Sequence, residues 1–148
     1  MNAPVLTDQF GRRIDYVRLS VTDRCDLRCS YCMPEGFKGF EEPEHWLNFD
    51  ETERLIGAFA RLGVRRIRLT GGEPLLRRNI SELAARIAAL PGIDDLSLST
   101  NATQLDKHAH ALKAAGVTRL NVSLDSLQQA RVEKINGRDV LAKVMAGL

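Results

Sequence analysis

The sequence is poor in several features that mark particular classes of protein. It has 148 residues, of which three are cysteine and 5% are aromatic, and its formal net charge is only +2. The balance of charge excludes a strongly basic or acidic tail, so we expect no nucleic-acid partner. No apolar stretch is long enough to span a bilayer, so we expect no membrane partner. Residues 1–8 lack a basic start followed by an apolar segment, and we expect no secretory signal.

The three cysteines, Cys25, Cys29 and Cys32, all fall within eight residues. An odd number of clustered thiols cannot form a self-contained disulfide framework, and it indicates thiols that are kept reduced in a cytoplasmic protein. The hydrophobic content of 44% and charged content of 27% are those of an ordinary globular protein. The length predicts a single domain over residues 1–148.

Short strand patterns alternate with helical patterns along the chain. Period-two alternation predicts strands, and apolar residues at helical spacing predict helices between them. The first helix is expected to begin at a capping box formed by Asp50 and Glu53, and to close at Gly63. The strands are predicted at 16–22, 66–70, 95–100 and 119–125. The other helices are predicted from 80 to an end at Pro91-Gly92, from 105 to a stop at Gly116, at 126–136 and at 139–148.

This strand–helix alternation predicts an α/β fold with a parallel sheet and right-handed crossovers. A complete eight-unit barrel takes about 250 residues, so the chain supplies about four βα units. We therefore expect a partial parallel (β/α) barrel. Because a half-barrel leaves an open edge strand, either the chain is a fragment or another chain completes it.

Polar and apolar residues alternate within each predicted strand. In the first strand Val17 and Leu19 point to one side while Arg18 and Ser20 point to the other. If the apolar set packs on the helices, the polar set faces the interior of the curved sheet, and that lumen should hold a polar ligand. Arg18 and Arg68 on this face favour a phosphate or a carboxylate. The alternative is an antiparallel sheet with one face in water.

The cysteine spacing, Cys-x3-Cys-x2-Cys, follows directly after the first strand. Thiolates suit zinc or an iron–sulfur cluster. A closed zinc site needs four ligands, and the chain has no second cysteine pair, while its three histidines are distant in sequence. Three cysteines could hold a cubane cluster by three irons and leave the fourth iron open. Zinc binding and three unrelated core thiols stay open as alternatives.

Longer strings around these residues carry a resemblance. The cysteine spacing, with Tyr31 before Cys32, resembles the signature of the radical S-adenosylmethionine (SAM) enzymes. The wider set is similar to the GTP 3′,8-cyclase family over essentially the whole chain. It comprises the sequences at 6–8, 18–25, 31–34, 68–77, 99–101 and 121–127.

The resemblance implies a role for particular residues. Three cysteines would ligate a [4Fe–4S] cluster, with SAM chelating the open iron, and two further groups would contact SAM and GTP. The cluster ligands would be Cys25, Cys29 and Cys32; the SAM contacts Tyr31, Gly71, Gly72, Glu73 and Ser123; and the GTP contacts Arg18, Arg68 and Ser99.

The resemblance further implies a radical SAM lyase of molybdenum cofactor (molybdopterin) biosynthesis, which converts GTP to (8S)-3′,8-cyclo-7,8-dihydroguanosine 5′-triphosphate. Its partners would be GTP, SAM and an electron donor, and a homodimer is an assembly that the resemblance allows. Full-length members hold a second [4Fe–4S] cluster on C-terminal cysteines, so residues 1–148 are expected to be the N-terminal portion of the radical SAM core and an incomplete enzyme. The alternatives are another radical SAM enzyme, of the peptide-modifying type, and a non-catalytic iron–sulfur or zinc-binding module.

Three positions depart from the family pattern. Asp26 stands where the family usually has Asn, and Ser99 replaces a frequent Thr but keeps the hydroxyl. Ala102 stands where glycine is usual, and we expect it to strain a turn that prefers glycine.

Overall fold

The computed structural model describes residues 4–34, 36–40 and 43–148. The expectation of no secretory signal concerned residues 1–8, and of these residues 1–3 lie outside the described range. The strands are β1 (Tyr16–Ser20), β2 (Arg66–Thr70), β3 (Asp95–Thr100) and β4 (Arg119–Val122). The helices are α1 (Phe49–Arg61), α2 (Ile80–Ala88), α3 (Leu105–Ala115), α4 (Gln129–Asn136) and α5 (Leu141–Gly147), with 3₁₀ turns η1 (Pro43–His45) and η2 (Pro74–Leu76).

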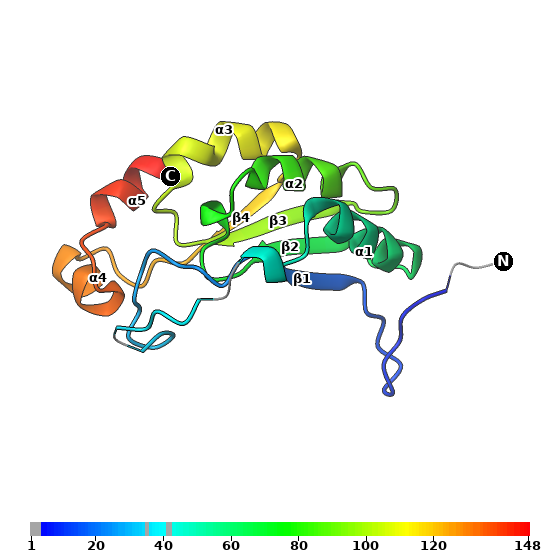
Figure 1. Cartoon of the computed structure of the whole chain (residues 1–148), viewed down its shortest axis with the longest axis horizontal. Helices are drawn as coiled ribbons and strands as arrows, with labels where there is room; N and C mark the ends of the chain where they lie inside the picture. Colours follow the sequence, from blue (N-terminus) through cyan, green and yellow to red (C-terminus); the bar gives the residue numbers. More distant parts are fainter. Residues whose placement is uncertain (1–3, 35, 41–42) are drawn as a thin grey trace.

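The four strands form one sheet in the order β1-β2-β3-β4, and each neighbouring pair is parallel. The helices α1, α2 and α3 lie along the same face of this sheet (Figure 1). This arrangement confirms the α/β class and the partial parallel barrel, and it excludes the antiparallel alternative. Parallel strands need long crossover connections, and the helices supply them.

The strands begin at the predicted residues, but two of them end earlier than predicted. β1 stops at Ser20 and β4 at Val122. The backbone nevertheless continues the pairing beyond both ends, because Val21 N donates to Thr70 O (3.0 Å) and Ser123 N donates to Thr100 O (2.9 Å).

The predicted capping box of α1 is wrong by two residues. Asn48 is the N-cap: its side chain accepts from the Glu51 backbone, and the Glu51 carboxylate accepts from the Asn48 backbone. Asp50 lies inside the first turn, where it pairs with Arg86 of α2 (2.5 Å). Both pairs of residues have the spacing of a capping box, so the spacing alone did not distinguish them.

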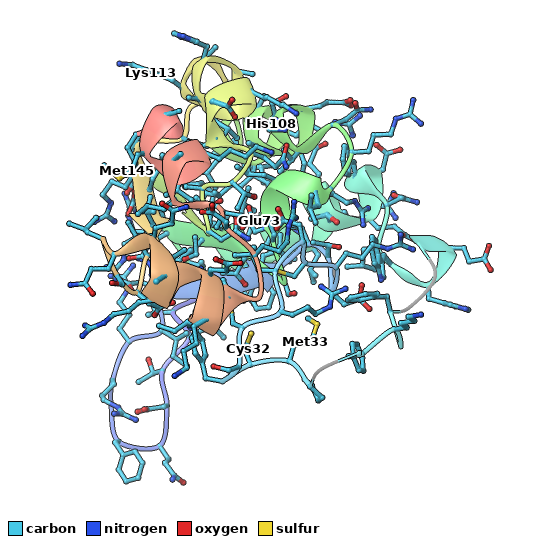
Figure 2. The ribbon with its side chains drawn as sticks, turned by 90° about the vertical axis from the view of Figure 1, so that its left-hand side faces the viewer. Cys32, Met33, Glu73, His108, Lys113 and Met145 are labelled. Carbon is cyan, nitrogen blue, oxygen red and sulfur yellow. The ribbon has the colours of Figure 1, made fainter. Side chains whose placement is uncertain are left out.

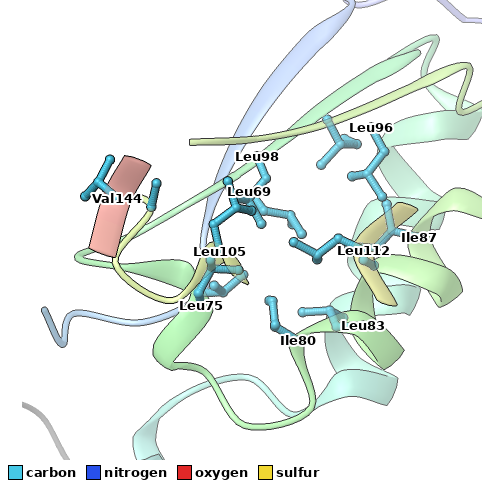
Figure 3. Close-up of a cluster of buried hydrophobic side chains, with 14 of the residues drawn as sticks. Leu69, Leu75, Ile80, Leu83, Ile87, Leu96, Leu98, Leu105, Leu112 and Val144 are labelled. Atoms are coloured by element: carbon cyan, nitrogen blue, oxygen red, sulfur yellow. The ribbon is translucent and has the colours of Figure 1, made fainter. Parts of the chain in front are cut away.

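The hydrophobic core lies between the sheet and the helices. Leu69 and Leu98 from the central strands meet Ile80, Leu83 and Ile87 from α2 (Figure 3), and all five are at most 2% exposed. Burying a side chain of this size contributes roughly 1.5–3 kcal/mol. Within the described residues, no helix is long and apolar enough to cross a membrane.

The other face of the sheet carries the polar residues of the alternating pattern. Arg18, Arg68 and Ser97 are direct neighbours in the strand register. Arg18 is exposed and Arg68 is half-buried, with its Nε donating to Ser97 Oγ (3.3 Å). The apolar set therefore packs on the helices as predicted, and among the described residues of the polar face Arg18 is open to solvent while Ser97 is buried beside Arg68.

Candidate functional site

The cysteine segment is attached by its backbone to the carboxyl end of β2. Gly72 N donates to Thr22 O (2.9 Å), and Glu73 N donates to Arg24 O (2.7 Å). These bonds hold the residues just before Cys25 against the turn that follows β2. The loop therefore begins at the edge of the sheet where parallel α/β folds place their ligands.

Gly71 and Gly72 make this attachment possible. A Cβ on Gly71 would lie 2.4 Å from Thr22 O, and one on Gly72 would lie 2.3 Å from Arg24 O. Gly71 also has φ of +149°, which side chains rarely adopt. In this structure the missing side chains admit the backbone of the cysteine segment. A contact of these glycines with SAM stays a prediction.

Glu73 lies inside the molecule, apart from Cys32 (Figure 2), and is 1% exposed. Its Oε1 accepts from Thr100 Oγ1 (2.7 Å) and Leu75 N (3.1 Å), and its Oε2 accepts from Asn101 N (2.7 Å). Burial raises the pKa of this carboxyl, although the hydrogen bonds act in the opposite direction. Glu73 therefore joins the ends of β2 and β3, and its predicted contact with SAM stays untested.

The turn after β3 connects to the cysteine segment through Asp26. The Asp26 carboxylate accepts from Asn101 Nδ2 (2.9 Å) and Thr103 Oγ1 (2.6 Å). Ala102, between them, is fully buried with φ of +62°, so the turn has the left-handed backbone that favours glycine. The strain expected at Ala102 is thus located in the backbone. Sequence reasoning did not assign Thr103, because no local pattern connects it with Asp26, which lies 77 positions earlier.

The three thiols lie on one loop but differ in exposure. Cys25 and Cys29 are half-buried and pack against the core, whereas Cys32 is exposed. Burial raises the pKa of Cys25, and burial together with the neighbouring Cys32 raises the pKa of Cys29 to about 11. In the described ranges, no three His, Cys, Asp or Glu side chains converge as in a metal site. The assignment of the three cysteines as cluster ligands therefore stays a prediction.

The donor set fits an iron–sulfur cluster. Three thiols on one short loop supply soft ligands, and Cys32 and Cys25 are among the neighbours that raise the pKa of Cys29. Cys32, the third thiol, is exposed. His108 belongs to α3 and lies well away from Cys32 (Figure 2), as expected for a helix histidine rather than a fourth zinc ligand.

Tyr31 connects the cysteine loop to the end of β4. Its hydroxyl donates to Asp125 Oδ2 (3.1 Å), although the residue as a whole is 65% exposed. Partial burial and the neighbouring Asp125 carboxylate raise the pKa of the phenol. Ser123, two residues before Asp125, is exposed at the same end of β4. The structure thus brings two of the predicted SAM-contacting residues to one edge of the sheet.

The predicted GTP-contacting residues lie on the open face. Arg18 and Arg68 face each other across β1 and β2, and Ser99 is half-buried on β3. Among the described residues, no carboxylate pairs with Arg18 or Arg68, although six other arginines form ion pairs. Two adjacent guanidinium groups without a carboxylate partner form a surface suited to an anion.

Relatives among curated proteins match the whole chain. The chain is 51% identical over 148 residues to the GTP 3′,8-cyclase of Ectopseudomonas mendocina (strain ymp), covering 100% of this chain and 44% of that protein. It is 52% identical over 143 residues to GTP 3′,8-cyclase 2 of Pseudomonas aeruginosa, covering 97% of this chain and 43% of that protein. The chain therefore spans less than half the length of these relatives.

Solved structures share the fold at low sequence identity. The Streptococcus suis protein SuiB bound to S-adenosylmethionine superimposes with a TM-score of 0.68 at 20% identity, covering 88% of this chain and 30% of that chain. BtrN, in complex with AdoMet and 2-DOIA, superimposes with a TM-score of 0.56 at 19% identity, covering 87% of this chain and 54% of that chain. The model of the radical SAM superfamily matches residues 19–148. The chain belongs to the radical SAM superfamily.

Proposed function

We propose that residues 1–148 are the N-terminal portion of the radical SAM core of a GTP 3′,8-cyclase, which converts GTP to (8S)-3′,8-cyclo-7,8-dihydroguanosine 5′-triphosphate in molybdenum cofactor biosynthesis. The observation that carries the proposal is the 51% identity to a named cyclase across all 148 residues. This identity spans every motif on which the resemblance depends. It favours a cyclase over a peptide-modifying radical SAM enzyme, because the likeness to SuiB is one of fold alone.

In this proposal Cys25, Cys29 and Cys32 hold a [4Fe–4S] cluster at the carboxyl edge of the sheet. When bound, the cluster and SAM supply the one-electron chemistry that removes a hydrogen atom from the ribose of GTP. Tyr31, Gly71, Gly72, Glu73 and Ser123 are the proposed contacts of SAM. The half-buried position of two thiols favours this role, because a shielded site excludes water from reactive species.

The open polar face of the sheet supplies the proposed GTP contacts. Arg18 and Arg68 bind the triphosphate by charge-assisted hydrogen bonds, and Ser99 offers a hydroxyl one strand further along. A reduced thiol site further favours a reducing compartment such as the cytoplasm. A second cluster, the electron donor and a homodimer, which the resemblance implies or allows, stay predictions.

A chimera tests the proposal directly. Residues 1–148 are joined to the C-terminal part of the Ectopseudomonas mendocina cyclase, and the product is reconstituted anaerobically with iron and sulfide. We expect the chimera to form the cyclised nucleotide from GTP, SAM and dithionite, measured by mass spectrometry, and the 148-residue chain alone to form none. For chimeras with Arg18→Ala or Arg68→Ala, Arg54→Ala on α1 is the control, since it removes the same charge from an exposed position on the helix-covered side of the sheet.

Three outcomes contradict the proposal at different levels. A chimera that cleaves SAM without consuming GTP is a radical SAM enzyme with another substrate. Zinc without sulfide after reconstitution identifies a zinc-binding module. A Cys25→Ala chimera with full activity contradicts the assignment of the cluster ligands.

A further inference from the structure

The residues on both sides of Cys29 are bound to the last turn of α4. Arg28 N donates to Asn136 O (3.0 Å), and Ser30 N donates to Ile135 O (2.9 Å). The last carbonyl groups of an α-helix have no partner within the helix, so these bonds satisfy two groups that would otherwise need water. Cys29 is therefore fixed by its own backbone neighbours to one end of α4.

The side chain of Asn136 meets the thiol of the same cysteine. Cys29 Sγ donates to Asn136 Oδ1 at 3.3 Å, and Asn136 is 4% exposed. A buried amide in contact with a thiol is a strong constraint, because neither group can move into water without losing its partner. Gly137 then ends α4 with φ of +75°, which takes the chain away from the thiol.

When Cys29 loses its thiol proton, the sulfur changes from a hydrogen-bond donor to an acceptor, so the amide must then donate. A thiol can donate to the amide oxygen, but a thiolate bound to iron can only accept. The two ends of the amide group differ little in size, so a half-turn about the Cβ–Cγ bond places Nδ2 where Oδ1 lies. Asn136 can therefore serve Cys29 as an acceptor before the ligand is deprotonated and as a donor afterwards.

The other asparagine near a thiol already presents its N–H group to the sulfur. Asn101 Nδ2 lies 3.9 Å from Cys25 Sγ and also donates to Asp26 Oδ1, and Asn101 Oδ1 accepts from Thr103 N. Asn101 therefore serves a different thiol and needs no turn of its amide. For Cys29, the amide in contact is that of Asn136.

We propose that Asn136 is a positioning residue for Cys29, and that its amide N–H, donated to the ligand sulfur, raises the reduction potential of the iron–sulfur cluster. The inference rests on the proposed function, since it requires Cys29 to be a cluster ligand. A hydrogen bond to a ligand sulfur stabilises negative charge on that sulfur, and a reduced cluster carries more negative charge than an oxidised one. Removing the N–H therefore makes reduction harder.

The test measures the midpoint potential of the reconstituted cluster by spectroelectrochemistry, with iron and sulfide contents determined in parallel. Asn136→Ala should shift the midpoint to a more negative value, and Asn136→Asp should shift it further, because a carboxylate beside the sulfur opposes added charge. Asn136→Ser, which keeps a hydroxyl donor, should recover part of the shift. Gln128→Ala is the matched control, since it removes an uncharged amide from the exposed first end of the same helix.

The outcomes separate this inference from the proposed function. Normal iron and sulfide contents with the same midpoint in wild type, Asn136→Ala and Asn136→Ser would overturn the role of Asn136 alone. Absence of iron and sulfide from the wild-type protein would overturn both proposals. If Asn136→Ala does not fold, the midpoint potentials of Asn136→Ser and Asn136→Asp are compared. A more negative midpoint in Asn136→Asp supports the inference, and equal midpoints in those two contradict it.

Discussion

At the scale of single residues, Glu73 is the most completely bonded polar side chain near the site. Its two oxygens accept from one hydroxyl and two backbone N–H groups, and Glu73, Thr100 and Leu75 are buried while Asn101 is half-buried. A buried acceptor that is removed leaves its donors unsatisfied, which costs more than the bonds contribute on balance. Glu73 therefore serves first to join two strand ends.

Glu73→Gln should lower the free energy of unfolding by about 2 kcal/mol, because an amide presents one acceptor and one donor where the site needs two acceptors. Either orientation leaves a backbone N–H, that of Leu75 or that of Asn101, without an acceptor. Urea denaturation measures the change. Glu133→Gln, at an exposed position of α4, is the control and should change the free energy of unfolding by less than about 0.5 kcal/mol. Equal losses in both variants would contradict this role of Glu73.

At the scale of elements, the turn after β2 and the cysteine segment form one unit because two glycines let their backbones meet. Gly72→Ala would place a Cβ 2.3 Å from the Arg24 carbonyl oxygen, so the cysteine segment must move. We expect a loss of roughly 1–3 kcal/mol in stability and weaker retention of iron after reconstitution. Calorimetric unfolding and iron analysis measure the two effects.

Gly57→Ala is the control for this substitution. Gly57 lies inside α1, and a Cβ there would meet no atom closer than 3.6 Å. Alanine should stabilise that helix by up to about 1 kcal/mol. A Gly72→Ala protein as stable as the wild type would show that the cysteine segment does not need this close approach.

Elements were also the scale at which sequence reasoning succeeded best. Period-two alternation predicted the start of every strand, and the stop at Gly116 was confirmed by its left-handed backbone (φ of +103°). The cap of α1 was misplaced because Asn48 and Asp50 each have an acidic partner three residues later. A local pattern therefore predicts the extent of a helix or strand better than it predicts which polar side chain caps it.

Contacts between distant residues could not be predicted in the same way. Asp26 and Thr103 are 77 positions apart, and Cys29 and Asn136 are 107 apart. No periodicity connects such pairs, since their meeting depends on how the loops leave the sheet. The motif residues could be named from the resemblance. Asn136 and Thr103, which contact them, could be identified only from the structure.

At the scale of the whole molecule, the sheet divides the protein into an apolar side under helices and an open side with arginines. Arg18 and Arg68 are neighbours on that open side. We expect Arg18→Ala and Arg68→Ala each to weaken GTP binding by roughly ten- to hundredfold, since a hydrogen bond to a charged group contributes roughly 1.5–3 kcal/mol. Calorimetric titration at low and high salt measures the loss, which should shrink as salt rises.

Arg54→Ala on the helix side should leave the affinity unchanged. An equal loss in all three variants would indicate general attraction of the anion by net charge rather than binding at the open face. Unchanged affinity in Arg68→Ala would contradict the assignment of this face to the triphosphate.

During synthesis on a ribosome, Cys29 emerges 107 residues before Asn136, the residue whose side chain contacts its thiol. Until α4 has been translated, the nascent loop lacks the two carbonyl groups that fix its backbone there. Before then the loop is held only at its start, by the bonds from Gly72 and Glu73 in the turn after β2. At the proposed cluster site, the contact between Asn136 and Cys29 can therefore form only after the last of the parallel strands described here has been translated.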